Sequence, residues 1–382
     1  MEVQVLKEHY LDNSATTQVL PQVAQMAVRM MTEEYGNPSS LHTRGFRARK
    51  LLEEARGQVA QRLGAQPEEI TFTSGGTESN NLAIFGAAQA RKRMGNKIVT
   101  TAAEHDSVLG PCRALEKQGF EVVYLKPDAS GHLSEEELVQ SIDQRTILVS
   151  VMLVNNETGA IFPVEAASRA IRRSKAPALL HVDAVQGFGK LPFTVKKLGA
   201  DLLTISGHKI HAPKGIGGLY VKKGVRILPH TLGGGQEKGL RSGTESAPLI
   251  CALGEAVRLL PPAQEALEQV GQLNALLRQR LEQLPQVTIH SPEDGLPYVL
   301  NFSAGRVRGE TMLHFLADRG VYVSSGSACG KAKPSHVLES MGLPKEQVES
   351  ALRVSFSRFS TPEDVETLVE GIKAGLENLA VR

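Results

Sequence analysis

The sequence of 382 residues contains few cysteines and no long apolar run. Its three cysteines, Cys112, Cys251 and Cys329, are an odd number without a CxxC spacing, so neither a disulfide framework nor a metal site is expected. No stretch approaches the roughly 20 apolar residues of a membrane span, and the first residues lack the basic and then apolar pattern of a secretory signal. We therefore expect a cytoplasmic protein with reduced thiols and no membrane association.

The charged residues show no excess of one sign. Lys and Arg total 43 and Asp and Glu total 41, which gives a formal net charge of +2, and no block of like charge occurs. The sequence therefore offers no electrostatic reason for nucleic acid to be a direct ligand. Hydrophobic residues make up 41% and charged residues 22%, values close to those of an average globular protein. A chain of this length suggests two domains.

Short strand-like runs alternate with helical patterns over the first two thirds of the chain. This alternation predicts an α/β domain with a mostly parallel, seven-stranded sheet wrapped by helices. The strand-like runs are residues 70–73, 97–101, 121–125, 146–152, 178–182, 201–205 and 218–221. We assign residues 16–258 to this large domain.

A smaller α+β unit is predicted for the rest of the chain. The double proline at residues 261–262 precedes a long amphipathic helix candidate at residues 263–284. Beyond it we predict strands at residues 287–290, 299–303, 320–323 and 353–356, and helices at residues 309–319 and 362–379. We assign residues 1–15 and 259–382 to this small domain, which carries Cys329.

Two polar residues stand where predicted strands end. Lys209 follows the strand-like run at residues 201–205, and Asp183 follows the run at residues 178–182. Open α/β sheets bind ligands at the carboxyl ends of their strands. An enzyme of pyridoxal 5′-phosphate (PLP) needs a lysine amine to hold the aldehyde and a carboxylate to keep the ring nitrogen protonated. The two residues are candidates for these roles.

A small-residue segment at residues 73–80 lies between a predicted strand and a predicted helix. Small residues there let backbone N–H groups approach a phosphate at the helix N-terminus. The alternative is an ordinary glycine turn with a helix cap. A dinucleotide-binding fold is disfavoured because no G-x-G-x-x-G opens the first strand-turn-helix unit.

Two further strand ends carry candidate site residues. His105 follows the run at residues 97–101, where an imidazole could lie over a cofactor ring, although a helix-cap neighbour or a satisfied core histidine is the alternative. Asn156 follows the run at residues 146–152, where its amide could contact the ring hydroxyl and a substrate carboxylate, although Asn also favours simple turns.

The cysteines differ in their surroundings. Cys112 and Cys251 lie in helix-like stretches, where a buried and inert thiol is expected. Cys329 lies among small residues at 323–331, with lysines just beyond it. Exposure and nearby positive charge both favour a thiolate at Cys329.

Taken together and in this order, the motifs resemble those of the cysteine desulfurases, which are PLP enzymes of fold type I and class V. The similarity runs nearly end to end. It includes the segments quoted above and residues 10–17, 36–40, 233–237, 241–245 and 353–355. The resemblance implies the PLP-transferase fold of type I.

The resemblance also implies roles for the cofactor-binding residues. Lys209 would bind PLP covalently, Asp183 would pair with the pyridine nitrogen, and His105 would stack on the ring and handle protons. Gln186 would hydrogen-bond the ring oxygen, with Asn156 nearby. The implied phosphate ligands are Gly76, Thr77, Ser206, His208 and, from the other subunit of a homodimer, Thr244.

On the substrate side, the resemblance implies that L-cysteine is converted to L-alanine. Arg353 would bind the substrate carboxylate, helped by Asn156 and Asn37, as a bidentate fork. Cys329 would take up the sulfur as a persulfide and deliver it to an acceptor protein, either a scaffold for iron–sulfur cluster assembly or an enzyme of tRNA or cofactor thiolation.

Other functions stay open at this point. A selenocysteine lyase or another class V aminotransferase would lack the persulfide step, and Cys329 argues against it. A non-catalytic scaffold would have no chemical need for the complete set of site residues. The stretch after Cys329, residues 330–333, looks shorter than in the housekeeping members of the family, which leaves the acceptor open. The loop still resembles the long type rather than the short type of the selenocysteine-preferring branch, and the sequence leaves the preference between cysteine and selenocysteine open.

Overall fold

The computed structural model describes residues 7–325 and 334–379. Its largest element is a seven-stranded sheet with the strand order β2-β8-β7-β6-β5-β3-β4. The strands are β2 (Ile70–Thr73), β3 (Lys97–Thr101), β4 (Glu121–Leu125), β5 (Thr146–Met152), β6 (Leu179–Asp183), β7 (Leu202–Ser206) and β8 (Gly217–Val221). The pairs β2–β8 and β8–β7 are antiparallel and the other four pairs are parallel, so the predicted mostly parallel sheet of seven strands is confirmed.

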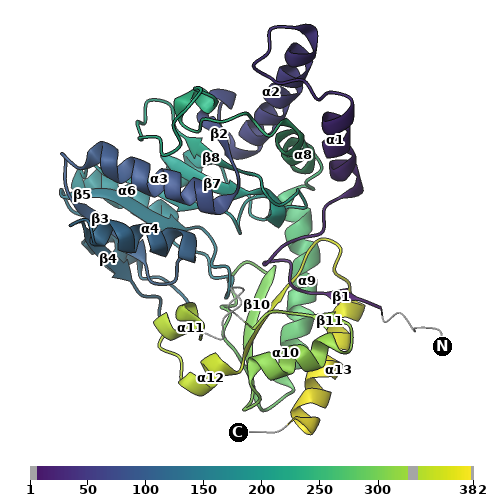
Figure 1. The fold of residues 1–382 in the computed structure, drawn as a ribbon. Helices are drawn as coiled ribbons and strands as arrows, with labels where there is room; N and C mark the ends of the chain where they lie inside the picture. The colour runs from purple at the N-terminus through teal and green to yellow at the C-terminus, as the bar shows by residue number, and fades with distance from the viewer. Residues whose placement is uncertain (1–6, 326–333, 380–382) are drawn as a thin grey trace.

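Helices cover both faces of this sheet (Figure 1). In β6, Leu180 and Val182 join one apolar cluster while Leu179 joins another, because successive side chains of a strand point to opposite faces. The first cluster is covered by α5 (Glu135–Ser141), α6 (Val164–Ser174) and α7 (Val195–Leu198), and the second by α3 (Gly76–Arg91) and α4 (Asp106–Glu116). Burial on both faces explains why these strands read as continuous apolar runs.

The C-terminal part of the chain forms a second, smaller α+β unit. Its antiparallel sheet has the order β12-β10-β9, and β1 pairs in parallel with β11 in a separate two-stranded sheet. Its elements are β1 (His9–Tyr10), α9 (Ala263–Glu282), β9 (Val287–Ile289), β10 (Val299–Ala304), α10 (Gly309–Ala317), β11 (Val321–Tyr322), α11 (His336–Ser340), α12 (Lys345–Glu349), β12 (Ala351–Ser355) and α13 (Pro362–Asn378). The domain boundary at residue 258 stays a prediction.

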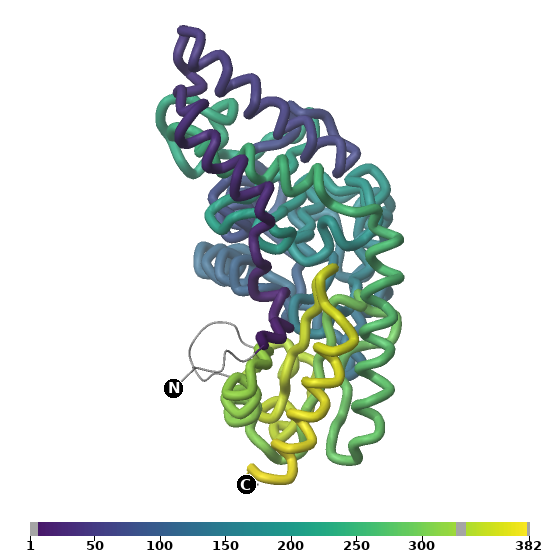
Figure 2. The backbone as a smooth tube through the Cα atoms, turned by 90° about the vertical axis from the view of Figure 1, so that its right-hand side faces the viewer, coloured from purple at the N-terminus to yellow at the C-terminus, as the bar shows by residue number. Residues whose placement is uncertain are grey.

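Three helices, α1 (Pro21–Thr32), α2 (Thr43–Leu63) and α8 (Ala247–Arg258), pack together beside the large sheet. Figure 2 shows the N-terminal segment running from the C-terminal unit to these helices, past the large sheet. Three short 3-10 helices complete the described structure: η1 (Pro67–Glu69), η2 (Gly207–Lys209) and η3 (Glu237–Gly239). No described helix is both long enough and apolar enough to cross a membrane.

Candidate active site

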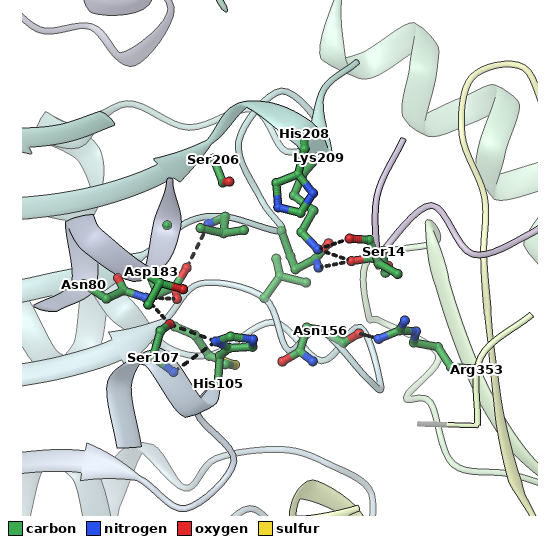
Figure 3. A pocket seen from close by; sticks show the side chains of 17 residues that line it. Ser14, Asn80, His105, Ser107, Asn156, Asp183, Ser206, His208, Lys209 and Arg353 are labelled. Carbon is green, nitrogen blue, oxygen red and sulfur yellow. Dashed lines mark hydrogen bonds between the residues drawn. The ribbon is translucent and has the colours of Figure 1, made fainter. Parts of the chain in front are cut away.

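A pocket of about 300 Å³ opens where the carboxyl ends of β5, β6 and β7 meet the N-terminal segment and β12 (Figure 3). Parallel strands place the residues that follow them along one edge, so segments far apart in the sequence contribute to one site. The predicted site residues that line it are Gly76, Thr77, His105, Asn156, Asp183, Gln186, Ser206, His208, Lys209 and Arg353.

Lys209 ends the short helix η2, directly after β7. Its Nζ donates hydrogen bonds to the backbone carbonyls of Ser14 and Ala15, the latter at 2.8 Å. Burial, and then the nearby Arg353 guanidinium, lower the pKa of Lys209 to about 8 against the opposing effect of two carboxylates. A substantial fraction of the amine is therefore neutral near physiological pH, and the neutral amine is the nucleophilic form.

Asp183 is the last residue of β6 and is buried at the wall of the pocket. One carboxylate oxygen accepts a hydrogen bond from Asn80 Nδ2 at 2.7 Å, and the other accepts one from the backbone N–H of Val185 at 3.0 Å. These bonds fix the plane of the carboxylate, so it can hold a proton on a cationic ring nitrogen that enters the pocket.

A chain of hydrogen bonds connects Asp183 with His105 (Figure 3). Asn80 Nδ2 also donates to Ser107 Oγ at 2.8 Å, and that oxygen lies 2.8 Å from His105 Nδ1. The same Nδ1 accepts the backbone N–H of Ser107 and so caps α4. Both readings of His105, helix cap and pocket residue, therefore hold. Burial is the main cause that lowers its pKa, and the neutral ring then carries its proton on Nε2.

The N-terminus of α3 faces the opposite end of the pocket. Its N-cap residue, Gly75, provides no side-chain hydrogen bond, so the first backbone N–H groups of the helix are available to an anion. A Cβ atom at Gly76 would lie 3.0 Å from Val185 Cγ2, which explains why glycine is needed at this close approach. His208 lies at the same wall, and burial together with the Lys209 charge lowers its pKa to about 4.

Arg353 lies in β12 with its side chain 1% exposed. It donates to the carbonyl of Asn156 at 3.0 Å and to Asp12 Oδ1 at 2.9 Å. Within the described chain its Nε and the side-chain oxygen of Asn156 are buried without a hydrogen-bond partner. Buried polar atoms are rarely left unpaired, which indicates that a polar ligand binds at this corner. A guanidinium binds carboxylates with two parallel hydrogen bonds, so a carboxylate is the expected ligand.

The pattern described as "Aminotransferase class-V" matches residues 9–368. The chain belongs to the class-V aminotransferase family. The cysteine desulfurase 2 of Trichormus variabilis is 44% identical over 380 residues, which cover 97% of this chain and 93% of the relative. The cysteine desulfurase IscS 1 of Archaeoglobus fulgidus is 40% identical over 376 residues, with 97% of each chain covered. Within its family, the chain therefore belongs to the cysteine desulfurases.

Solved structures of this class-V aminotransferase group agree with that assignment. A NifS-like protein superposes with a TM-score of 0.92 at 38% identity, covering 98% of this chain and all of the other. SspA, solved in complex with cysteine, gives a TM-score of 0.82 at 34% identity over 93% of this chain and all of the other. The predictions of fold and enzyme class made from the sequence are thus confirmed.

Class-V aminotransferases imply PLP as the cofactor, and the pocket fits it. The site offers a buried amine of lowered pKa, a fixed carboxylate and an uncapped helix N-terminus. Among the described residues, one buried side-chain oxygen each of Ser14 and Asn80 at its wall has no hydrogen-bond partner, so both are available to a polar ligand. Sequence reasoning missed Ser14, Ala15, Asn80 and Ser107 as site residues. Asn80 lies in the segment at residues 73–80, and Ser14 and Ala15 lie in the segment at residues 10–17. Only the hydrogen bonds of Asn80 to Asp183 and of Ser107 to His105 reveal the roles of Asn80 and Ser107.

Two predicted site residues of this cysteine desulfurase do not line the pocket. Asn37 is exposed between α1 and α2, where its side chain accepts the backbone N–H of Ser39 at 2.9 Å. Thr244 is exposed beyond η3. Their roles stay predictions, and within a single chain neither side chain reaches the site.

Cys329 lies outside the described residues. On its N-terminal side, Ser324 exchanges two backbone hydrogen bonds with Arg353, of 2.7 and 3.1 Å. On its C-terminal side, the Ser335 hydroxyl donates to the carboxylate of Glu157, the residue after Asn156. Described residues on both sides of Cys329 thus contact the substrate corner of the pocket. The other two cysteines are buried, as predicted, and burial raises the pKa of each to about 12.

Proposed function

We infer that this protein is a PLP-dependent cysteine desulfurase that converts L-cysteine to L-alanine and passes the sulfur to Cys329. The observation that carries this inference is the meeting of the Lys209 amine, the Asp183 carboxylate and the Arg353 guanidinium in one pocket. The cysteine bound by the similar SspA supports L-cysteine as the substrate. When bound, PLP supplies an electron sink for the negative charge that develops at the substrate Cα.

The residues present can hold the cofactor at each of its functional groups. Lys209 would bind the aldehyde carbon, and Asp183 would hold the proton on the ring nitrogen. His105 would pack on the ring, and Gln186 would donate to the ring oxygen. The phosphate is held by the N-terminus of α3, which Gly76 and Thr77 begin, and by Ser206 and His208 at the same wall.

The substrate side of the pocket is organised around one carboxylate site and two proton carriers. Arg353 binds the carboxylate of L-cysteine through a guanidinium whose position Asp12 and the Asn156 carbonyl already fix. The Lys209 amine would remove the proton from Cα, for which its neutral form, favoured by the pKa of about 8, is required. His105 moves a second proton at its Nε2.

The Cys329 thiolate completes the reaction. It attacks the sulfur of the substrate, a sulfur–sulfur bond forms, and the carbon–sulfur bond of the substrate breaks. The electron pair of that bond stays with the carbon fragment, which is protonated and leaves as L-alanine. One cysteine and one protein thiol thus become one alanine and one protein persulfide, with no external oxidant or reductant.

Several finer expectations belong to this proposal. We propose a homodimer, in which Thr244 of one subunit reaches the phosphate of the other. A protein acceptor takes the sulfur from Cys329, for cluster assembly or for thiolation of tRNA or a cofactor. The cytoplasmic location expected from the sequence also stays a prediction.

The test is paired detection, by mass spectrometry, of L-alanine and of a persulfide on Cys329 after L-cysteine is added to the PLP-loaded protein. We expect equal amounts of both in the wild type and neither in Cys329→Ala. Cys251→Ala removes a buried thiol away from the pocket and serves as the matched control, which should retain both products. Bound PLP without a persulfide would indicate another class V reaction, such as that of a selenocysteine lyase.

A further inference from the structure

A second buried lysine lies behind the pocket. Lys190 follows β6 by seven residues, and its side chain is buried. Its Nζ donates to Gln186 Oε1 at 3.2 Å and lies 5.5 Å from the centre of the Tyr298 ring. Among the described residues, no carboxylate forms an ion pair with it. Burying an amine without an opposite charge is costly, so its place beside the pocket calls for an explanation.

The Lys190 amine determines which way the Gln186 amide faces. The amine donates an N–H to the amide oxygen, and in its protonated form, which predominates below its pKa of about 7, it has no acceptor, so only the oxygen of the amide can face it. The amide nitrogen is then turned the other way, where Nε2 donates to the Ser14 carbonyl at 3.0 Å. The same carbonyl accepts a hydrogen bond from Lys209. Gln186 lines the pocket, and the second N–H of its amide is left for a ligand there.

We propose that Lys190 is a positioning residue, which holds the Gln186 amide so that its remaining N–H faces the pocket and donates to the anionic ring oxygen of the cofactor. This role rests on the proposed function. Without Lys190, the amide could rotate and present its oxygen to that anion. The arrangement Lys190–Gln186–Ser14 carbonyl–Lys209 therefore couples a residue outside the pocket to the lysine that binds the cofactor.

The charged groups around Lys190 also favour an anion on the cofactor, because most of them are positive. Lys209 and Arg353 face it from the pocket, and His211 and Arg358 line with it a neighbouring cavity of about 30 Å³. The positive charge of Lys190 is also one of the causes that lower the pKa of His208. Burial, and then the positive charges of Lys209 and Arg353, lower the pKa of Lys190 to about 7. A cationic surrounding without a carboxylate partner favours an oxygen anion on the cofactor.

The proposal is tested by a pH titration of the visible absorbance of bound PLP, which changes when the linkage to Lys209 loses its proton. A donor to the ring oxygen stabilises the anion and lowers the pKa of this linkage. We expect the apparent pKa to rise by about one unit in Lys190→Met, the low end of the range for a lost charged neighbour. Gln186→Leu should produce a similar rise.

A double-mutant cycle distinguishes positioning from an independent effect of charge. If Lys190 acts through Gln186, the variant with both substitutions shifts the pKa no further than Gln186→Leu alone. Additive shifts, or no shift in Lys190→Met, would overturn the proposal. Lys190→Gln retains an N–H donor without the charge and should shift the pKa less than Lys190→Met. An equal shift in the two variants would also count against positioning.

The controls separate this inference from the proposed function. Lys97→Met removes another buried lysine, paired with Asp143 at 2.9 Å outside the pocket, and should leave the titration unchanged. Equal melting temperatures show that each variant is folded. A wild type that binds no PLP would overturn the proposed function together with this inference. A wild type that titrates normally beside an unshifted Lys190→Met would overturn only the role of Lys190.

Discussion

The inner wall of the pocket and the segment that carries Thr244 are built in different ways. The inner wall, formed by Asn80, His105, Asp183, Gln186 and Lys209, is joined by hydrogen bonds within this chain and follows buried strands. The Thr244 segment, residues 231–245, is largely exposed and contains one short 3-10 helix. One chain therefore brings together the residues that we propose to hold the ring and the lysine linkage. In the proposed homodimer, Thr244 of a second copy would complete the outer part of the phosphate site.

The Thr244 segment is nevertheless held in a defined shape. Glu237 and Lys238 have φ angles of 47° and 57°, a region that non-glycine residues occupy at a cost of about 1–3 kcal/mol each. Two ion pairs fix the segment to the body, Arg56 with Glu237 at 2.9 Å and Arg241 with Glu78 at 2.8 Å. Glu78 lies in the first turn of α3, so the segment is positioned relative to the phosphate end of the pocket.

The largest loss of activity is expected for a substitution of Lys209, in the inner wall of the pocket. Lys209→Ala removes both the amine that binds the cofactor and the base at Cα, so alanine formation should fall by about 100- to 10,000-fold, the range for one acid–base group. The covalent cofactor linkage, detected by reduction with borohydride and mass spectrometry, should be absent. Lys196→Ala, an exposed lysine outside the pocket, should behave as the wild type. Retained linkage in Lys209→Ala would refute the assignment.

A smaller effect is expected at the substrate corner. Arg353→Lys keeps the charge but loses the planar fork, so a hydrogen bond to the substrate carboxylate, worth about 1.5–3 kcal/mol, is lost. KM for L-cysteine should rise by about 10- to 100-fold while kcat changes less, as steady-state kinetics would show. Arg278→Lys, at carbonyls of Ser291 and Pro292, is the control. An unchanged KM would contradict the assignment of Arg353 as the residue that binds the substrate carboxylate.

Much of the fold could be predicted because buried parallel strands leave a strong signal. The runs at residues 70–73, 97–101, 121–125 and 146–152 coincide with β2 to β5. The strand β1 was not predicted, since two residues show no alternation and pair with β11 more than 300 positions away. Local patterns identify an element but do not reveal such a partner.

The site residues were likewise predicted where a local pattern marks them and missed where their role depends on a distant contact. Lys209, Asp183, His105 and Asn156 were predicted from the sequence because each follows a strand, and the sheet brings the strand ends together. The Ser14 carbonyl, which accepts from both Lys209 and Gln186, could not be predicted, since a backbone group leaves no mark on the sequence. Its contribution depends on the N-terminal segment crossing the pocket, which is a tertiary feature.

The smallest effect concerns the Thr244 segment. In Thr244→Ala the phosphate loses one hydrogen bond, worth about 1 kcal/mol, so PLP affinity should weaken about fivefold. Fluorescence titration of the apoprotein with PLP measures this change. Thr231→Ala, in the same exposed segment with only backbone pairing to Arg241, should leave the affinity unchanged.

A hybrid dimer shows which subunit Thr244 serves. One chain carries Lys209→Ala with Thr244 intact, and its partner carries Thr244→Ala with Lys209 intact. The single lysine-competent site then receives an intact Thr244 only if the residue acts across the interface. Half of the wild-type activity with wild-type PLP affinity would establish that the outer phosphate site is shared between subunits. The weakened affinity of the Thr244→Ala homodimer would instead mean that Thr244 acts within its own chain, after a movement of residues 231–245 toward the pocket.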